Sequence, residues 1–230
     1  MYFISIIILV AASIFAMYAQ FKVNNAFSTY EDVPSSSGIS GAQAARMILD
    51  RNGLSDVVIK EIGGRLSDHY DPRTQEISLS SDVYRGTSIS AVSVATHEVG
   101  HAIQHEHNFA PLIFRNAIVP VVNLVSRAVW PLVMISIFLM YGRNFQMGDT
   151  LLTVAALAMG AVVLFHLITL PVELDASRRA LYQLETTGIF RDEELAGGKR
   201  VLSAAALTYL AALSVSVANL IRILAMRSDN

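Results

Sequence analysis

Long runs of apolar residues alternate with polar stretches along the 230-residue chain. Four runs approach or exceed the roughly 20 apolar residues that cross a bilayer; they cover residues 3–19, 117–141, 151–170 and 201–224. The pattern predicts a polytopic membrane protein with about four transmembrane helices. The first run lacks a basic leader and a small-residue cleavage site, so we interpret it as a retained anchor in preference to a secretory signal.

Two polar stretches, residues 21–114 and 172–200, lie between these runs. Both fall on the same face of the membrane, because two crossings separate them. The longer stretch predicts a helix at 41–51 capped by Ser40, a strand at 57–62, and a hairpin with strands at 65–70 and 76–80. A further helix is predicted to begin at Ser88 or Ser90 and to run to about His107.

Composition and charge narrow the function classes. The chain is 53% hydrophobic and 16% charged, a balance typical of an integral membrane protein and opposite to that of a disordered chain. The net charge of −2 gives a nucleic-acid partner no electrostatic support. The chain has no cysteine, so a disulfide framework and a thiol nucleophile are excluded, and any metal must be held by His, Asp or Glu.

A short motif in the last predicted helix of the long polar stretch points to metal chemistry. It reads His97-Glu98-Val99-Gly100-His101. On a helix the two histidines share one face, one turn apart, and can bind one Zn²⁺. Glu98 then stands where it can act as general base on a water in the open position of the metal. The alternative, a set of surface polar residues, is disfavoured by the apolar neighbours of the motif.

The third ligand must come from elsewhere in the chain. His107 has the spacing of a third histidine, but Gln104 stands where such sites need a glycine to turn the backbone. His105 extends the histidine row without completing a tetrahedron. Glu173 is the better candidate, because it follows the third apolar run on the same side of the membrane as His97. His166, two helical turns earlier, is more simply explained by interhelical hydrogen bonding.

Several short motifs of the sequence resemble those of the YugP-type neutral zinc metallopeptidases, a bacterial family of membrane proteins. The resemblance covers essentially the whole chain, in the same order. The motifs are Ser67-Asp68-His69-Tyr70-Asp71-Pro72, the run HEVGHAIQH from His97 to His105, Leu170-Pro171-Val172-Glu173-Leu174-Asp175-Ala176-Ser177 with Arg179-Ala180, and Ala206-Leu207-Thr208-Tyr209.

A more distant similarity is to the membrane zinc proteases of the HtpX and CAAX-processing kind, whose third ligand is the Glu of a Glu-x-x-Ala-Asp word. Glu173 fits that position, but Ser177 replaces the Asp, so Asp175 is expected to supply the carboxylate that hydrogen-bonds a ligand. The similarity also implies an edge strand that holds the substrate, with the hairpin around Asp71 and Pro72 as the candidate. His69 or Arg179 would then help the metal to stabilise an oxyanion, although a turn-stabilising role for His69 is the more ordinary explanation.

The sequence therefore predicts a mainly α polytopic membrane protein with a small α+β zincin-like catalytic domain, an HExxH helix beside a small sheet. Its expected division is an N-terminal anchor at 1–20, a catalytic region at 21–116, two transmembrane helices at 117–171, a third-ligand helix and loop at 172–200, and a last transmembrane helix at 201–230. The expected function is that of a zinc metalloendopeptidase of the gluzincin kind, acting on a protein or peptide substrate. Its rival is a non-catalytic membrane protein that binds or senses metal.

The orientation follows from the basic residues near the membrane ends. Six lie on the side of the zinc motif and three on the other side. They are Lys22, Arg115, Arg178, Arg179, Lys199 and Arg200 against Arg143, Arg222 and Arg227. By the positive-inside rule, the protein is expected to be a multi-pass bacterial cell-membrane protein with a cytoplasmic active site.

Overall fold

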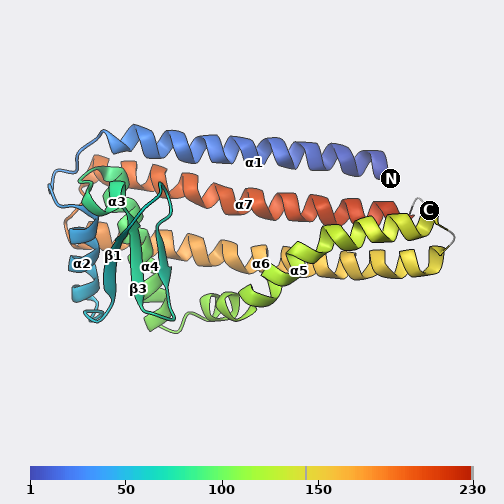
Figure 1. Cartoon of the computed structure of the whole chain (residues 1–230). Coiled ribbons are helices and arrows are strands. Elements are labelled where there is room, and N and C mark those ends of the chain that lie inside the picture. Colours follow the sequence, from blue (N-terminus) through green and yellow to red (C-terminus); the bar gives the residue numbers. More distant parts are fainter. Residues whose placement is uncertain (143, 229–230) are drawn as a thin grey trace. The chain divides into compact units, whose positions relative to one another are not determined.

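A computed structural model describes residues 1–142 and 144–228 of the chain; Arg143 and the last two residues of the expected C-terminal segment lie outside the described residues. The elements run in the order α1 (Tyr2–Glu31), α2 (Gly41–Arg51), β1 (Val58–Ile62), β2 (His69–Asp71), β3 (Glu76–Ser80), α3 (Ser81–Arg85), α4 (Ile89–Glu106), α5 (Ala110–Tyr141), α6 (Phe145–Thr186) and α7 (Asp192–Ser228) (Figure 1). The predicted fold class, mainly α with a small sheet, is confirmed.

The chain divides into two compact units. One, the apolar unit, comprises residues 1–19, 114–170 and 208–230. The other, the polar unit, comprises residues 20–113 and 171–207. The division falls close to the ends of the four apolar runs, because apolar segments pack against apolar segments and polar segments pack against polar segments.

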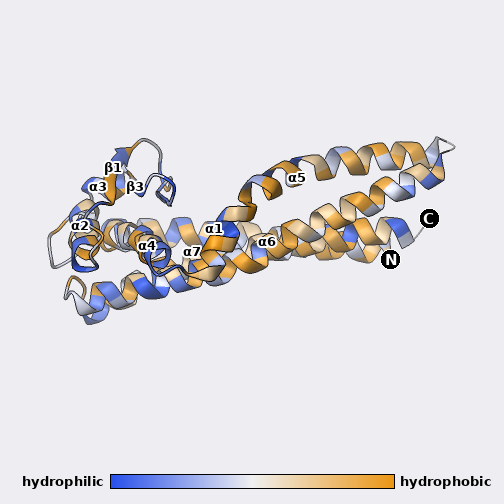
Figure 2. Cartoon of the chain, turned by 90° about the horizontal axis from the view of Figure 1, so that it is seen from below, coloured by the Kyte–Doolittle hydropathy of each residue, from blue (hydrophilic) through white to orange (hydrophobic). Residues whose placement is uncertain are grey.

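The apolar unit is built from parts of the four helices that are long and apolar enough to cross a membrane, α1, α5, α6 and α7. Orange hydrophobic ribbon dominates these parts in Figure 2. A cluster of buried residues from α5, α6 and α7 includes Val129, Val133, Leu152 and Ile223. Large apolar side chains on other faces stay exposed, as expected of helices whose outer solvent is lipid.

The polar unit has its core between α2, α4 and the sheet. Helix α2 begins as predicted, because the Ser40 side chain accepts a hydrogen bond from Gln43 N and the Gln43 side chain accepts one from Ser40 N. The predicted hairpin is confirmed: β2 pairs antiparallel with β3, with Tyr70 opposite Ile77. The sheet order is β1-β3-β2, with β1 parallel to β3. This leaves β2 at one edge.

Several boundaries differ from the sequence prediction. Strand β2 covers His69–Asp71 instead of 65–70, and α7 begins at Asp192 rather than at residue 201. Helix α1 continues past the apolar run to Glu31, and α5 begins at Ala110 rather than at residue 117. Helix α6 runs without a break through Pro171, so the predicted third-ligand helix is the C-terminal part of α6. The change from apolar to polar residues marks a change of solvent, not the end of a helix. A proline inside a long helix removes one backbone hydrogen bond, which the rest of the helix outweighs.

Candidate metal centre and active site

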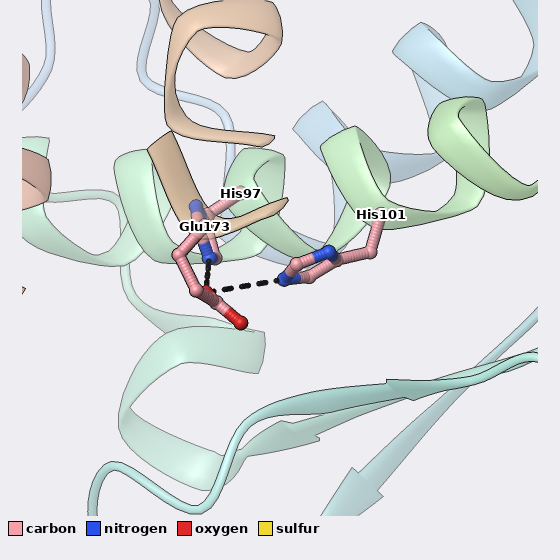
Figure 3. A group of neighbouring side chains, drawn as sticks. All are labelled: His97, His101 and Glu173. Carbon is pink, nitrogen blue, oxygen red and sulfur yellow. Dashed lines mark hydrogen bonds and ion pairs between the residues drawn. The ribbon is translucent and has the colours of Figure 1, made fainter. Parts of the chain in front are cut away.

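Helix α4 presents the zinc motif. It begins at Ile89, after the N-cap residue Ser88, whose hydroxyl accepts a hydrogen bond from Ala91 N. The helix is buried along most of its length in the polar unit. His97 and His101 lie one turn apart, and their rings meet edge to face with centroids 4.8 Å apart. Figure 3 shows the two imidazoles projecting from the same face of the helix. A regular helix therefore supplies two of the three ligand candidates in one direction.

Glu173 reaches this face from α6, and Gly100 explains how the two helices come so close. A Cβ placed on Gly100 would lie 2.5 Å from the carbonyl oxygen of Ala176, a contact that no other residue could make without moving the backbone. Ala176 is itself fully buried. The glycine inside the motif thus lets α6 pass directly over α4, one turn beyond Glu173.

The three side chains converge on one point. Glu173 Oε2 lies 3.3 Å from His97 Nε2 and 3.5 Å from His101 Nε2, and the ligand atoms of the group all lie within 4.8 Å of one another (Figure 3). Two atoms that bind one zinc ion at 2.0–2.1 Å with a tetrahedral angle lie about 3.3–3.4 Å apart. The two distances from Glu173 to the imidazole nitrogens therefore fit a shared Zn²⁺.

The charge state of Glu173 agrees with this role. Burial acts to raise the pKa of its carboxyl, but hydrogen bonds with His101 and His97 outweigh burial and hold the pKa below its usual range. The side chain is 4% exposed. A buried carboxylate kept ionised between two imidazoles is a typical metal ligand.

Gln104 fixes the ring of His101. Its Nε2 donates to the carbonyl oxygen of Val172 at 2.8 Å and to Asp175 Oδ2 at 3.0 Å, so its Oε1 must face the other way. There it lies 3.0 Å from His101 Nδ1, which as the donor must carry the proton. In the neutral ring His101 Nε2 then directs a lone pair at the Glu173 carboxylate, and only a second proton on the ring would give the hydrogen bond that lowers the pKa of Glu173. Two acceptors at 3.5 Å need a proton or a cation between them, so this arrangement also fits a metal.

Ser177 performs the corresponding contact on His97. Its hydroxyl lies 3.2 Å from His97 Nδ1, from the position where the wider group of proteases has Asp. The hydroxyl can accept a hydrogen bond from Nδ1–H, which leaves the lone pair of Nε2 for a metal. Asp175, expected to take this place, instead reaches His101 through Gln104. Burial acts to raise the pKa of Asp175, but hydrogen bonds from Arg179, Gln104 and Arg178 outweigh it and lower the pKa.

Glu98 is buried beside the candidate ligands, with 7% of its surface exposed. Burial raises the pKa of its carboxyl to about 7; a positive charge on His97 opposes this rise, and the carboxylates of Glu173 and Asp68 add to it. A group with a pKa near neutrality can both accept and return a proton at physiological pH. This is the property that a general base which later acts as an acid requires.

The remaining candidate residues occupy the surroundings of the site. His69 lies on the edge strand β2, where its Nδ1 donates to the carbonyl oxygen of Ser67, and a positive charge on it acts to lower the pKa of Glu98. Arg179 is engaged by Asp175 at 2.6 Å and by His107 at 3.2 Å. Its role at an oxyanion stays a prediction. His107 thus contacts Arg179 and lies outside the ligand group.

Two further histidines have other partners. His105 Nδ1 lies 2.9 Å from the Tyr70 hydroxyl, a contact between α4 and the edge strand. His166 lies on the α6 part of the apolar unit, with its ring 5.6 Å from that of Phe165.

Sequence reasoning missed the roles of Gln104 and Ser177. The available signal was their spacing of three from His101 and four from Glu173, which places each on the same helix face as a ligand.

With the geometry in place, comparison with known proteins defines the class. The family described as "Putative neutral zinc metallopeptidase" matches residues 5–228, so the chain belongs to this family. Among curated proteins it is similar to the "Putative membrane protease YugP" of Bacillus subtilis (strain 168), with 46% identity over 217 residues, 94% of this chain and 93% of the relative. No solved structure matches the chain.

Proposed function

We propose that the protein is a membrane-embedded zinc metalloendopeptidase in which His97, His101 and Glu173 hold Zn²⁺ and Glu98 is the general base. The observation that carries the proposal is the convergence of two Nε2 atoms on one carboxylate oxygen, at distances that suit a shared Zn²⁺, with a buried carboxyl next along the helix. Zinc held there would supply Lewis acidity, which polarises a carbonyl and acidifies water.

The chain's own groups would move the proton. Glu98 accepts it from the attacking water and returns it to the leaving amine, for which a pKa of about 7 is suited. Gln104 and Ser177 keep the Nδ1 protons of His101 and His97 in place, so that both Nε2 lone pairs stay directed at the metal. Asp175 and Arg179 support this arrangement from behind Gln104.

The edge strand β2 supports a mode of substrate binding. In the sheet it pairs with β3 on one side only, and it contacts α4, which carries the motif. An extended peptide could add to the other side as a further strand, with backbone hydrogen bonds that do not depend on its sequence. The substrate class proposed is therefore a protein or peptide segment in extended conformation, including segments of membrane proteins.

The alternative is a non-catalytic metal-binding or metal-sensing protein. Three ligands and their hydrogen-bond partners would serve either function. Glu98 favours the enzyme, because metal binding does not require a buried carboxyl beside the first ligand, and burying it is costly.

Metal removal tests the proposal. The purified full-length protein should cleave an unstructured protein substrate, lose this activity on treatment with a chelator, and regain it on addition of one equivalent of Zn²⁺. Retention of full activity after zinc has been removed to below stoichiometric levels would contradict the proposal. Stoichiometric zinc binding without hydrolysis of any peptide library would favour the sensing alternative.

We also propose that the active site faces the cytoplasm, supported by the six-to-three excess of basic residues on its side. The chain has no native cysteine, so a single one can be introduced at the exposed Ser81. It should react with an impermeant maleimide only after the cells are opened. Labelling in intact cells would reverse the orientation.

A further inference from the structure

A cavity in the polar unit lies between the last turns of α1 and the first turns of α7, in a part of the unit that does not include the zinc motif. Its volume is about 680 Å³. The lining residues recur at helical spacing, so one face of each helix forms one wall. These residues are Lys22, Asn25, Ala26, Thr29 and Tyr30 on α1, and Ala196, Lys199, Arg200, Ser203, Ala204 and Leu207 on α7.

Side-chain size explains why the cavity exists. At the end of the cavity formed by Tyr30 and Gly197, the two helices are in direct contact, since a Cβ on Gly197 would lie 2.8 Å from the Tyr30 ring. Arg200 donates to the Tyr30 hydroxyl at 3.1 Å and joins the helices there. Further along, the lining residues Ala26 and Ala204 are small, and the space between the helices stays open.

The cavity is positively charged. Lys22, Lys199 and Arg200 line it, and no acidic residue is among the described residues of its wall. Glu31, the next residue after Tyr30, forms an ion pair with Arg65 at 2.7 Å. Hydroxyl and amide groups on the same walls add hydrogen-bond donors. Three cations with such donors match a phosphate group.

The position of these residues in the chain sets the level of the cavity relative to a membrane. Lys22 follows the end of the first apolar run by three residues. Ser203 and Leu207 lie within the last apolar run, which begins at residue 201. The Lys199 and Arg200 end of the cavity therefore belongs at the level of lipid headgroups, and its Ala204 and Leu207 end, with Lys22 at a similar level on α1, belongs at the boundary with the hydrocarbon.

We propose that this cavity binds the phosphate-bearing headgroup of an anionic phospholipid, with the basic side chains around the phosphate and the acyl chains along Ala204 and Leu207. Basic pockets between helices at a membrane surface are known to take such headgroups. The proposal is independent of the zinc chemistry, since the cavity shares no residue with the ligand group. A bound lipid would tie the end of α1 to the start of α7 at the membrane surface.

Electron paramagnetic resonance of spin-labelled lipids tests the proposal on the full-length protein. The protein is reconstituted in phosphatidylcholine vesicles with a minor fraction of spin-labelled phosphatidylglycerol, and the motionally restricted fraction gives its relative affinity. The double variant Lys22→Gln/Lys199→Gln retains the contact between Arg200 and Tyr30. We expect it to lower the relative affinity about tenfold or more. The matched control Arg51→Gln/Lys60→Gln removes the same charge from exposed positions elsewhere in the polar unit and should change it little.

A second variant separates the cavity from general surface charge. Ser203→Phe fills the space and leaves every charge in place, so it should release the restricted lipid as the lysine variant does. Equal losses in the lysine variant and its control, or full retention in Ser203→Phe, would overturn the cavity as the site. Inorganic phosphate added to the vesicles should not displace the lipid at millimolar concentration; displacement would assign the cavity to a soluble phosphate instead.

Discussion

In the apolar unit the side chains of Leu124, Phe138 and Leu157 are 72–75% exposed. In the polar unit Glu98, Glu173 and Asp175 are 7% exposed or less. Each unit thus departs from the pattern of a water-soluble domain. The apolar unit exposes large apolar side chains, and the polar unit buries carboxylates. Exposed apolar surface is favourable in lipid and requires no special arrangement. Buried carboxylates are costly, and they persist only where hydrogen bonds or metal ions compensate.

This contrast shows where the sequence is constrained by function. The apolar unit needs helices of the right length and hydrophobicity, and many sequences satisfy that. In the polar unit, polar groups around the candidate site form a connected set, from Arg179 through Asp175 and Gln104 to His101 and Glu173. A half-satisfied set of this kind would be less stable than an apolar core. Its connection to the ligands is the structural reason to regard it as functional.

The largest effect is expected from removal of the proposed third ligand, Glu173. Zinc binding by a structural site amounts to about 10–16 kcal/mol, so loss of one ligand of three should weaken affinity by about 10³-fold. We expect this for Glu173→Ala, measured by competition with a chromogenic chelator. His107→Ala is the control and should bind zinc normally, since His107 contacts Arg179. The reverse pattern would remove α6 from the metal site.

A charge on the lipid-facing surface should come next. Leu157→Arg places an arginine near the middle of the third apolar run, where insertion costs about 3 kcal/mol. The same change at Met47, a 46% exposed position of α2, should cost less than about 0.5 kcal/mol. Thermal unfolding of both variants in lipid nanodiscs measures the difference. Equal tolerance at the two positions would contradict the division into a lipid-facing and a water-facing unit.

A smaller effect is expected from the hydrogen bonds behind the ligands. Gln104→Met keeps the shape of the side chain but loses its contacts with His101, Val172 and Asp175, and should lower zinc affinity about 10- to 100-fold. Ser90→Ala, in the same helix, is the matched control. It removes a buried hydrogen bond to the Phe27 carbonyl that touches no ligand. If both variants lose stability but neither changes zinc affinity, Gln104 has a structural role only.

The smallest effect concerns Glu194, at the start of α7. Burial acts to raise the pKa of its carboxyl, but hydrogen bonds from Ser36 and from the Arg191 backbone outweigh burial and lower the pKa. A lowered folded-state pKa gives stability that is fully present above the unfolded value of about 4.3 and is lost as the pH falls through the folded value. Since the group is largely solvated, this amounts to no more than about 1 kcal/mol.

Glu194→Gln tests that assignment. The variant should unfold at a lower temperature than the parent at pH 7, and the two melting temperatures should converge as the pH falls below about 4. A constant difference at all pH values would show that the charge of Glu194 is not what stabilises the start of α7.

Local signals made much of the fold predictable from the sequence. Ser40 and Gln43 specify a capping box, and the turn at Asp71 and Pro72 specifies the hairpin. The parallel pairing of β1 with β3 was missed, because it joins segments across the hairpin and has no local pattern. The continuation of α6 through Pro171 was missed as well. The change from apolar to polar composition there indicates a change in the surroundings of the helix, and it does not show where the backbone hydrogen bonds end.

Residue chemistry and the number of membrane crossings were enough to predict which three side chains form the candidate metal site. Those arguments brought Glu173 to the face of His97 and His101, and the structure groups the three. They used Gln104 only to argue against His107. Its actual contacts depend on where the backbone of Val172 lies relative to α4, which the close packing at Gly100 determines. Such contacts between distant segments require a three-dimensional structure.

The most direct test of the account is peptide hydrolysis by the zinc-loaded Glu98→Gln variant. Gln has the shape of Glu but cannot accept a proton, so the variant should bind one zinc per chain, unfold at or above the temperature of the parent, and lose activity by about 10²- to 10⁴-fold. Unchanged hydrolysis by a folded, zinc-loaded Glu98→Gln protein would contradict the assignment of Glu98 and with it the proposed mechanism.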